Sequence, residues 1–150
     1  MLKDPSSQSP SLSSRRQSRT HSCRPRVPIS DGRNLRSRRN QMALSKLTDA
    51  DFRRDVENAE GRVVVDFYAD WCGPCHQVAP ALEELSSKWE GDIRFVKVDI
   101  DESPQLAQAY RVFSIPTIML FEGGKVVAHT MGARPAHAIE HELGLAEHAA

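Results

Sequence analysis

The chain has 150 residues, enough for one domain, and its two ends differ sharply in charge. Residues 1–41 contain ten basic and two acidic residues, whereas residues 42–150 contain ten basic and eighteen acidic residues, so that +8 and −8 cancel. No apolar run reaches the roughly 18 residues that a membrane span requires. No apolar signal segment follows the N-terminal charges either, so we predict neither a membrane span nor a membrane partner.

Residues 1–41 are predicted to be a disordered Arg/Ser-rich extension, because their few apolar residues are scattered without a period. Three origins are open for this segment. It is a dispensable stretch before a true start at Met42, a targeting peptide, or a basic arm that binds nucleic acid. No aromatic residue is interleaved for base stacking, so we predict no nucleic-acid partner. We expect a cytoplasmic protein, with organellar targeting by residues 1–41 as the alternative.

Residues 42–150 are predicted to form one domain that starts with a short strand and a helix. Thr48 followed by Asp51 indicates a helix N-terminus, and Phe52 and Val56 then share one face. The β-branched run Val63–Val65, continued by Phe67, indicates a strand buried on both faces.

The next predicted unit is a strand–helix–strand crossover, which implies parallel strands. Its helix has apolar residues at spacings of four, three and four, at Val78, Leu82, Leu85 and Trp89. Pro80 lies within this helix and is expected to kink it. The second strand of the unit is predicted over Ile93–Val98.

The last third of the chain predicts a helix, a hairpin and a final helix. Ser103 and Pro104 indicate a cap and first turn, with Leu106 and Tyr110 one turn apart. Strands 117–121 and 126–130 are joined through two glycines that suit a primed hairpin turn. The final helix is predicted to bury Ile139, Leu143 and Ala146. The expected architecture is a mixed α/β sheet with helices on both sides.

Cys72 and Cys75 are the strongest functional signal, whereas Cys23 stands alone in the extension. A close cysteine pair in a reducing compartment indicates redox or metal chemistry. At a helix start the two sulfurs lie on one side, and the helix N-terminus favours a thiolate at Cys72. We predict that Cys72 attacks a substrate disulfide and that Cys75 resolves the intermediate.

Metal-binding interpretations of these motifs are weaker. A zinc site needs two more ligands and the chain has no second CxxC motif. Cys72–His76 also matches a haem-attachment pattern, and His137–His141 matches a zinc-peptidase pattern that lacks its downstream ligand. We therefore predict no metal and no haem.

Asp66 is a carboxylate within an apolar strand, one residue before Phe67. Burial would raise its pKa and prepare it to accept a proton near neutral pH. The alternative is that Asp66 faces solvent at a strand end.

The segment Val65–Cys75, which reads VDFYADWCGPC, together with Ser114-Ile115-Pro116-Thr117, resembles the thioredoxin family. The similarity extends over nearly all of residues 42–150 and includes the hairpin and Gly132. This resemblance implies a thioredoxin-like fold and reduction of disulfides in target proteins. It also implies that NADPH supplies the electrons through thioredoxin reductase, without a cofactor of the protein's own. We expect a monomer.

The resemblance also implies individual roles. Asp66 would deprotonate the resolving cysteine with Lys97 packed beside it, and Pro116 would be a cis proline opposite the dithiol. Trp71 and Gly132 match positions that flank the substrate groove, although ordinary packing is an alternative for Trp71. Gly73 and Pro74 form the dipeptide of the reductants, whereas oxidases and isomerases usually carry His there.

Two positions depart from the family pattern. His76 stands where Lys or Arg is usual, which would make redox poise or reductase docking more dependent on pH unless His76 is an ordinary surface histidine. Tyr68 replaces a common tryptophan. The alternatives to a reductase are a thiol oxidase or isomerase of the same fold and a non-catalytic binding subunit.

Overall fold

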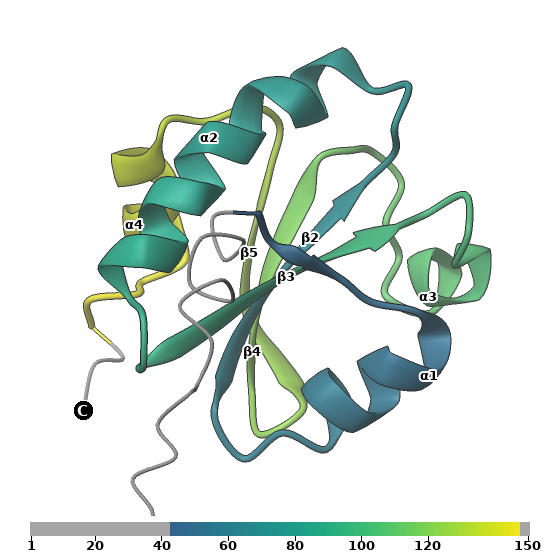
Figure 1. The fold of residues 1–150 in the computed structure, drawn as a ribbon, viewed down its shortest axis with the longest axis horizontal. Coiled ribbons are helices and arrows are strands. Elements are labelled where there is room, and N and C mark those ends of the chain that lie inside the picture. Colours follow the sequence, from purple (N-terminus) through teal and green to yellow (C-terminus); the bar gives the residue numbers. More distant parts are fainter. Residues whose placement is uncertain (1–42, 148–150) are drawn as a thin grey trace, which may run out of the picture. The chain divides into compact units, whose positions relative to one another are not determined.

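The computed structural model describes residues 43–147, so the predictions for residues 1–41 and Cys23 lie outside the described residues. The expected order of elements is confirmed, including the short leading strand (Figure 1). In chain order the elements are β1 (Ser45–Lys46), α1 (Asp49–Phe52), the π-helix η2 (Arg53–Glu57), β2 (Arg62–Tyr68), α2 (Gly73–Lys88), β3 (Ile93–Asp99), α3 (Pro104–Ala109), β4 (Thr117–Glu122), β5 (Lys125–Met131) and α4 (Ala136–Glu142).

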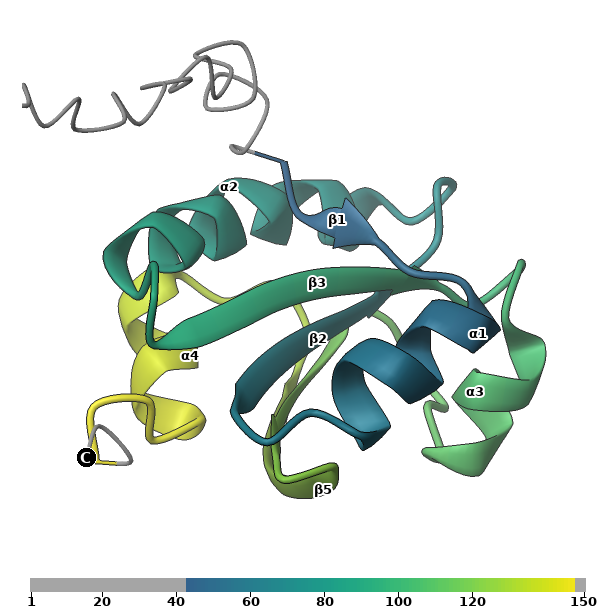
Figure 2. The ribbon, with the colours of Figure 1, turned by 60° about the horizontal axis from the view of Figure 1, so that its bottom comes forward.

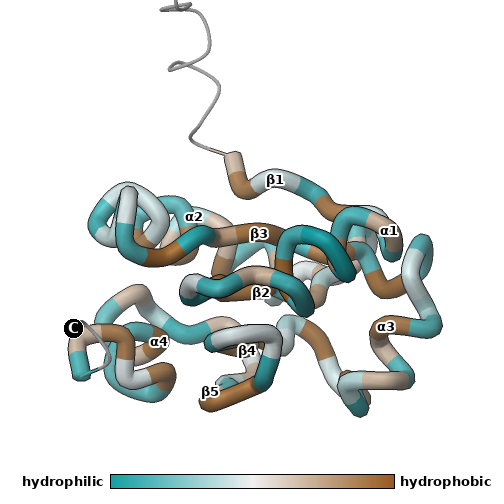
Figure 3. The backbone as a smooth tube through the Cα atoms, turned by 90° about the horizontal axis from the view of Figure 1, so that it is seen from below, coloured by the Kyte–Doolittle hydropathy of each residue, from teal (hydrophilic) through white to brown (hydrophobic). Residues whose placement is uncertain are grey.

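The strands form one mixed sheet in the order β1-β3-β2-β4-β5. The crossover through α2 makes β2 parallel to β3, with Asp66 paired with Lys97, and β1 is also parallel to β3. β4 runs antiparallel to β2, and β5 antiparallel to β4. Figure 3 shows the strands stacked in this order, with α2 and α4 on one side and α1 and α3 on the other.

Each face of the sheet is covered by its own apolar cluster, because successive strand residues point to opposite faces. Val64 of β2 faces α2 and α4, whereas Val63 and Val65 face α1 and η2. The cluster under α2 and α4 contains Val64, Val78, Leu82, Leu85, Ile93, Phe95, Ile118, Leu120, Ile139, Leu143 and Leu145. The predicted burial of β2 on both faces is confirmed.

Helix α2 lies along the sheet beside α4 (Figure 2) and contains Pro80 at an exposed position. Pro80 has no N–H to donate to the His76 carbonyl four residues earlier. At the other end of the helix, Lys88 Nζ lies 2.7 Å from the Glu140 carboxylate of α4, and Trp89 Nε1 donates to it at 3.2 Å. Within residues 43–147, the helices are too short or too polar to cross a membrane.

The helix ends confirm two of the sequence predictions and correct one. The Thr48 hydroxyl accepts from the Asp51 N–H at 3.3 Å, and Phe52 and Val56 behind this cap are fully buried. Ser103 is the N-cap residue of α3 and Pro104 lies in its first turn, as predicted, although the Ser103 side chain makes no capping hydrogen bond. Ala146 is exposed rather than buried, since α4 ends at Glu142 and Gly144 (φ 62°) turns the chain so that Leu145 enters the core.

The β4–β5 hairpin has the predicted primed turn, because Gly123 (φ 54°) and Gly124 (φ 75°) both have left-handed backbone. A Cβ atom on Gly124 would also collide with the backbone carbonyl of Glu57. Glycine at this position therefore allows the turn to pack against the end of η2.

Candidate active site

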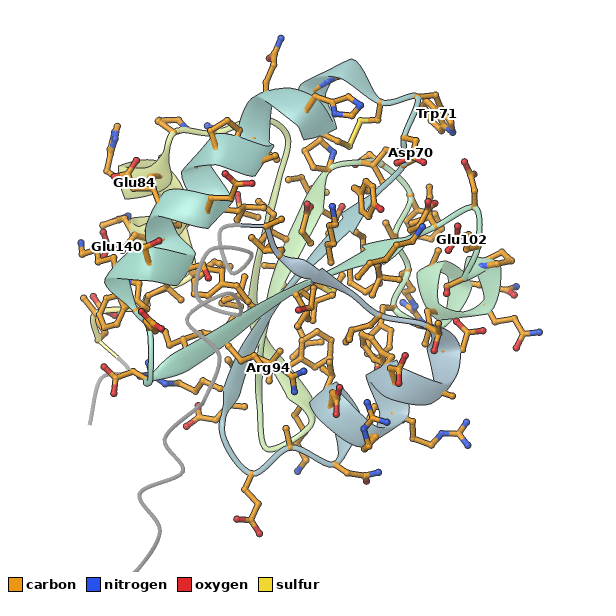
Figure 4. All side chains as sticks on the ribbon, in the orientation of Figure 1. Asp70, Trp71, Glu84, Arg94, Glu102 and Glu140 are labelled. Atoms are coloured by element: carbon orange, nitrogen blue, oxygen red, sulfur yellow. A yellow bond between two sulfur atoms is a disulfide. The ribbon has the colours of Figure 1, made fainter. Side chains whose placement is uncertain are left out.

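The two cysteines lie at the start of α2, directly after the loop that leaves β2. Cys72 is the N-cap residue, and its Sγ accepts a hydrogen bond from the Cys75 N–H at 3.2 Å. The two residues form a disulfide, with their Cα atoms 5.3 Å apart (Figure 4). Both side chains are only 4% exposed, and the apolar cluster around them consists of Tyr68, Ala69, Ile100 and Ile115. The N-terminal amides of the helix favour a thiolate on Cys72 once the disulfide is reduced.

Hydrogen bonds at both ends hold the loop before Cys72, and the indole of Trp71 in this loop is exposed to solvent. The Cys72 N–H donates to the Ala69 carbonyl at 3.1 Å, and His76 Nε2 lies 2.7 Å from the Asp70 carbonyl. Since a carbonyl only accepts, His76 Nε2 carries the proton of this bond. Trp71 is 70% exposed, and its Nε1 donates to Asp101 at 2.7 Å. Trp71 is therefore a surface residue beside the disulfide, not a core residue (Figure 4).

A second loop approaches the disulfide before β4. The Ile115–Pro116 peptide bond is cis, as predicted, and Ile115 packs against the cluster that contains both sulfurs. The Gly132 N–H donates to the Pro116 carbonyl at 2.8 Å, and Gly132 has a φ of 86° with open space around a Cβ position. The structure thus brings the cis proline loop, Gly132 and the disulfide to one end of the sheet.

Asp66 lies near the C-terminal end of β2 and is buried. This excludes the alternative that Asp66 faces solvent at a strand end. Its side chain lies on the face that α2 covers, because Val64 of the same strand points there. Asp66 is 4% exposed, and its Oδ1 has no hydrogen-bond partner within the described part of the chain. Burial raises the pKa of Asp66 to about 7, against an opposing effect of the Lys97 charge.

Lys97 acts on Asp66 without a direct ion pair. The two residues are paired across β2 and β3, yet no salt bridge joins them among residues 43–147. Lys97 Nζ instead lies 5.0 Å from the centroid of the Tyr68 ring, a cation–π contact with a buried aromatic residue. Burial also raises the pKa of the Tyr68 phenol. The Lys97 ammonium group therefore contacts the Tyr68 ring of the disulfide cluster, while its charge still lowers the pKa of Asp66 against the effect of burial.

Several contacts at the site were not anticipated from the sequence. Ile115 lies against the sulfurs, Asp101 binds the Trp71 indole, and Tyr68 holds Lys97. The ends of the parallel strands β2 and β3 meet at one edge of the sheet, which is a signal that the residues just after β3 approach Trp71. Within residues 43–147, no group of three or more His, Cys, Asp and Glu side chains is arranged to hold a metal ion.

A disulfide between two cysteines of one CxxC motif at a helix N-terminus is the arrangement of a thiol–disulfide oxidoreductase. Residues 43–144 match the thioredoxin family model. Thioredoxin 1 of Nostoc sp. (strain PCC 7120) is 44% identical over 101 residues, covering 67% of this chain and 94% of the relative. Thioredoxin of Staphylococcus aureus (strain Mu50) is 48% identical over 94 residues, covering 63% and 88%.

A similar solved structure comes from a study of the thiol resolving mechanism in yeast mitochondrial 1-Cys peroxiredoxin via glutathione and thioredoxin systems. Its chain is 36% identical, with a TM-score of 0.59, and the match covers 66% of this chain and 92% of that one. The chain described here belongs to the thioredoxin family. Its Cys72–Cys75 pair is redox-active and makes it a thiol–disulfide reductase.

Proposed function

We propose that Cys72 is the attacking thiol and Cys75 the resolving thiol in the reduction of disulfides in other proteins. The observation that carries this assignment is the position of Cys72 as the N-cap of α2, between the exposed residues Trp71 and Gly73. Its sulfur receives the Cys75 N–H bond and the field of the helix terminus, both of which stabilise negative charge. Cys75 lies one turn inside the helix.

The proposed reaction has two exchange steps. The Cys72 thiolate attacks one sulfur of the target disulfide, forms a mixed disulfide and releases the other target sulfur as a thiolate that takes up a proton. Cys75 then loses its proton and attacks Cys72 Sγ, which releases the second target thiol and forms the Cys72–Cys75 disulfide. Two electrons pass from the dithiol to the target.

Asp66 is the proposed proton acceptor for Cys75. A carboxylate with a pKa of about 7 is half ionised at neutral pH, which suits a general base there. Tyr68, two residues along the same face of β2, belongs to the cluster that contains both sulfurs. Lys97 is proposed as the positioning residue whose charge keeps part of the Asp66 population ionised.

The groove for the target is proposed to run between two rims beside the disulfide. One rim consists of Trp71, Gly73 and Pro74. The other rim consists of the Pro116 loop and Gly132. Ile115 packs against the cluster that contains both cysteines, and the Gly132 N–H donates to the Pro116 carbonyl. An extended target segment fits between these rims with its disulfide over Cys72.

The oxidised protein is proposed to be reduced by NADPH through a thioredoxin reductase. It would need no cofactor of its own, because the disulfide itself carries the two electrons. We propose a cytoplasmic monomer, with an organelle as the alternative if residues 1–41 act as a targeting peptide. The family membership supports disulfide-containing proteins as the targets.

The test is a trapping experiment with the two single-cysteine variants. Cys75→Ser should accumulate a mixed disulfide with a target peptide, and Cys72→Ser should neither trap the peptide nor turn over. Multiple turnover by either variant would contradict the assignment. A midpoint potential of the wild-type pair near about −270 mV supports a reductase, whereas a value near about −120 mV supports the thiol oxidase alternative.

A further inference from the structure

Among residues 43–147, Phe113 is the most exposed of the large apolar side chains. It is 90% exposed, compared with 70% for Trp71, 53% for Met131, 46% for Val127 and 41% for Val126. Single exposed apolar residues are common on protein surfaces. Phe113 differs because it lies in the loop that carries the cis proline, next to Ser114, whose hydroxyl contacts Met131.

Met131 is joined to the Phe113 loop by specific contacts. The Ser114 hydroxyl donates to Met131 Sδ at 3.5 Å, and Thr117 is paired with Met131 across β4 and β5. Gly132 directly follows Met131, and its N–H donates to the Pro116 carbonyl at 2.8 Å. The loop that carries Phe113 and the end of β5 that carries Met131 therefore lie side by side, whereas Trp71 lies in the loop that precedes α2.

The loop cannot turn Phe113 inward without breaking contacts on both of its sides. The Val112 N–H donates to the Ala107 carbonyl at 2.8 Å, and the Val112 side chain packs against the cluster under α1. On the other side, the Thr117 hydroxyl donates to the Ser114 carbonyl at 2.6 Å. A loop whose backbone is held in this way needs little further ordering when a partner covers it, which favours binding.

The loop also leaves main-chain groups open next to Phe113. Neither the N–H nor the C=O of Ile115 takes part in a hydrogen bond within the described residues. An extended polypeptide that reaches Cys72 can pair with these groups, as strands pair at a sheet edge. Successive residues of an extended chain advance by about 3.3 Å, so neighbours of the target cysteine come within reach of Phe113, two residues from Ile115.

We infer that Phe113 is a specificity-determining residue that binds an apolar side chain of the target close in sequence to its disulfide-bonded cysteine. Met131 forms the adjoining wall of this subsite. The occupant is a segment of the target polypeptide because the thiol–disulfide exchange itself brings such a segment to Cys72. This inference rests on the proposed function, in which Cys72 is the attacking thiol.

The experiment compares two disulfide-linked peptides that differ only in carrying Leu or Ser beside the cysteine. The full-length protein is first reduced chemically, so that no reductase contributes, and second-order rate constants for reduction of each peptide are measured. The wild type should reduce the Leu peptide faster than the Ser peptide. Phe113→Ser should lower this ratio about tenfold, a size expected from losing the contact of one buried aromatic ring.

Two further variants complete the test. Phe113→Leu should restore much of the preference, and Val127→Ser, which removes an exposed apolar residue elsewhere on the hairpin, should keep the wild-type ratio. An unchanged ratio in Phe113→Ser, or an equal loss with both peptides, overturns the inference. Failure of the wild type to reduce even a small disulfide such as hydroxyethyl disulfide would instead refute the proposed function.

Discussion

The two faces of the sheet are filled in different ways. Under α1 and η2, the rings of Phe52, Phe67, Tyr110 and Phe121 lie with centroids 5.3–6.3 Å apart. The one polar group of this cluster is satisfied, because the Tyr110 hydroxyl donates to Glu57 at 2.9 Å. Burial, followed by the Glu57 contact, raises the pKa of Tyr110 to about 12, so it remains a donor.

The face of the sheet under α2 contains a buried polar group whose hydrogen-bonding capacity is not satisfied among the described residues. Asp66 is buried there, and its Oδ1 has no hydrogen-bond partner among residues 43–147. Lys97 Nζ lies over the Tyr68 ring and forms no salt bridge with Asp66 among these residues. An unpaired buried polar group costs stability, whereas a satisfied aromatic cluster contributes to it. The difference indicates that one face stabilises the fold, while the other retains an energetically unfavourable group, for which we propose a role as proton acceptor.

The largest expected effect comes from truncating the aromatic cluster. Phe52→Ala removes a fully buried ring and should lower the free energy of unfolding by about 3–5 kcal/mol, with Phe52→Leu losing less. Denaturant unfolding measures this change. If the two faces have separate roles, the midpoint potential of Cys72–Cys75 should stay at the wild-type value. A shifted potential in a variant that remains folded would show that the two faces do not have separate roles.

Asp66→Asn should have the opposite effect on stability. The pKa of Asp66 is about 7 in the folded protein against 3.8 for the free group, so the folded state binds the proton more tightly. Stability therefore falls as pH rises from about 4 to about 7 and is level above that. At about 1.4 kcal/mol per pKa unit, and with a cost for the buried amide, the variant should gain on the order of 2–4 kcal/mol at pH 8.

Urea unfolding of the oxidised protein at pH 5 and pH 8 tests this expectation. The gain in Asp66→Asn should be much smaller at pH 5, where the wild-type carboxyl is largely protonated in the folded state. Asp92→Asn, at an exposed position, is the matched control and should leave the wild-type pH dependence intact. The same loss of stability between these pH values in Asp66→Asn would show that another group causes it.

Local patterns in the sequence were sufficient for most elements and for the core of the site. The apolar run around Val63–Val65 predicted the buried strand. It favoured burial of Asp66 but left open a solvent-facing carboxylate at the strand end, which the structure excludes. The CxxC spacing predicted the disulfide at the start of α2. The glycine pair predicted the primed turn because few other residues adopt left-handed backbone.

What the sequence did not reveal depends on residues that are distant in the chain. The contact of Lys97 with Tyr68 follows from the register of β2 against β3, which no local pattern specifies. The exposure of Phe113 was also missed, because one apolar residue in a loop belongs to no period that predicts its side. The end of α4 was misplaced because Gly144, and not apolar spacing, decides which residue enters the core.

Lys97→Met tests how much Lys97 contributes to the state of Asp66. It removes the positive charge that opposes the effect of burial on the pKa of Asp66. The pKa of Asp66 should rise further above about 7, by roughly one unit, because an adjacent positive charge favours the ionised form. The chemical shift of the Asp66 carboxyl carbon, followed against pH in the oxidised protein, measures the change without interference from the thiols. Lys97→Arg keeps the charge and should titrate close to the wild type. If the pKa of Asp66 were the same in Lys97→Met and in the wild type, Lys97 would have no effect on it, and burial alone would explain its raised value.

The smallest effect is expected at the cap of α1, which belongs to the stabilising face. Thr48→Ala leaves the Asp51 N–H without its hydroxyl partner and should cost about 1 kcal/mol in the free energy of unfolding, while Thr48→Ser should retain most of the cap. The cap residue lies one helical turn before Phe52. Its loss should therefore loosen the packing of the aromatic cluster and leave the disulfide unaffected. Hydrogen exchange should therefore speed up in α1 and η2 while the pKa of Asp66 stays unchanged. A change in that pKa would mean that the two faces of the sheet are coupled through β2, and the division of roles between them would have to be abandoned.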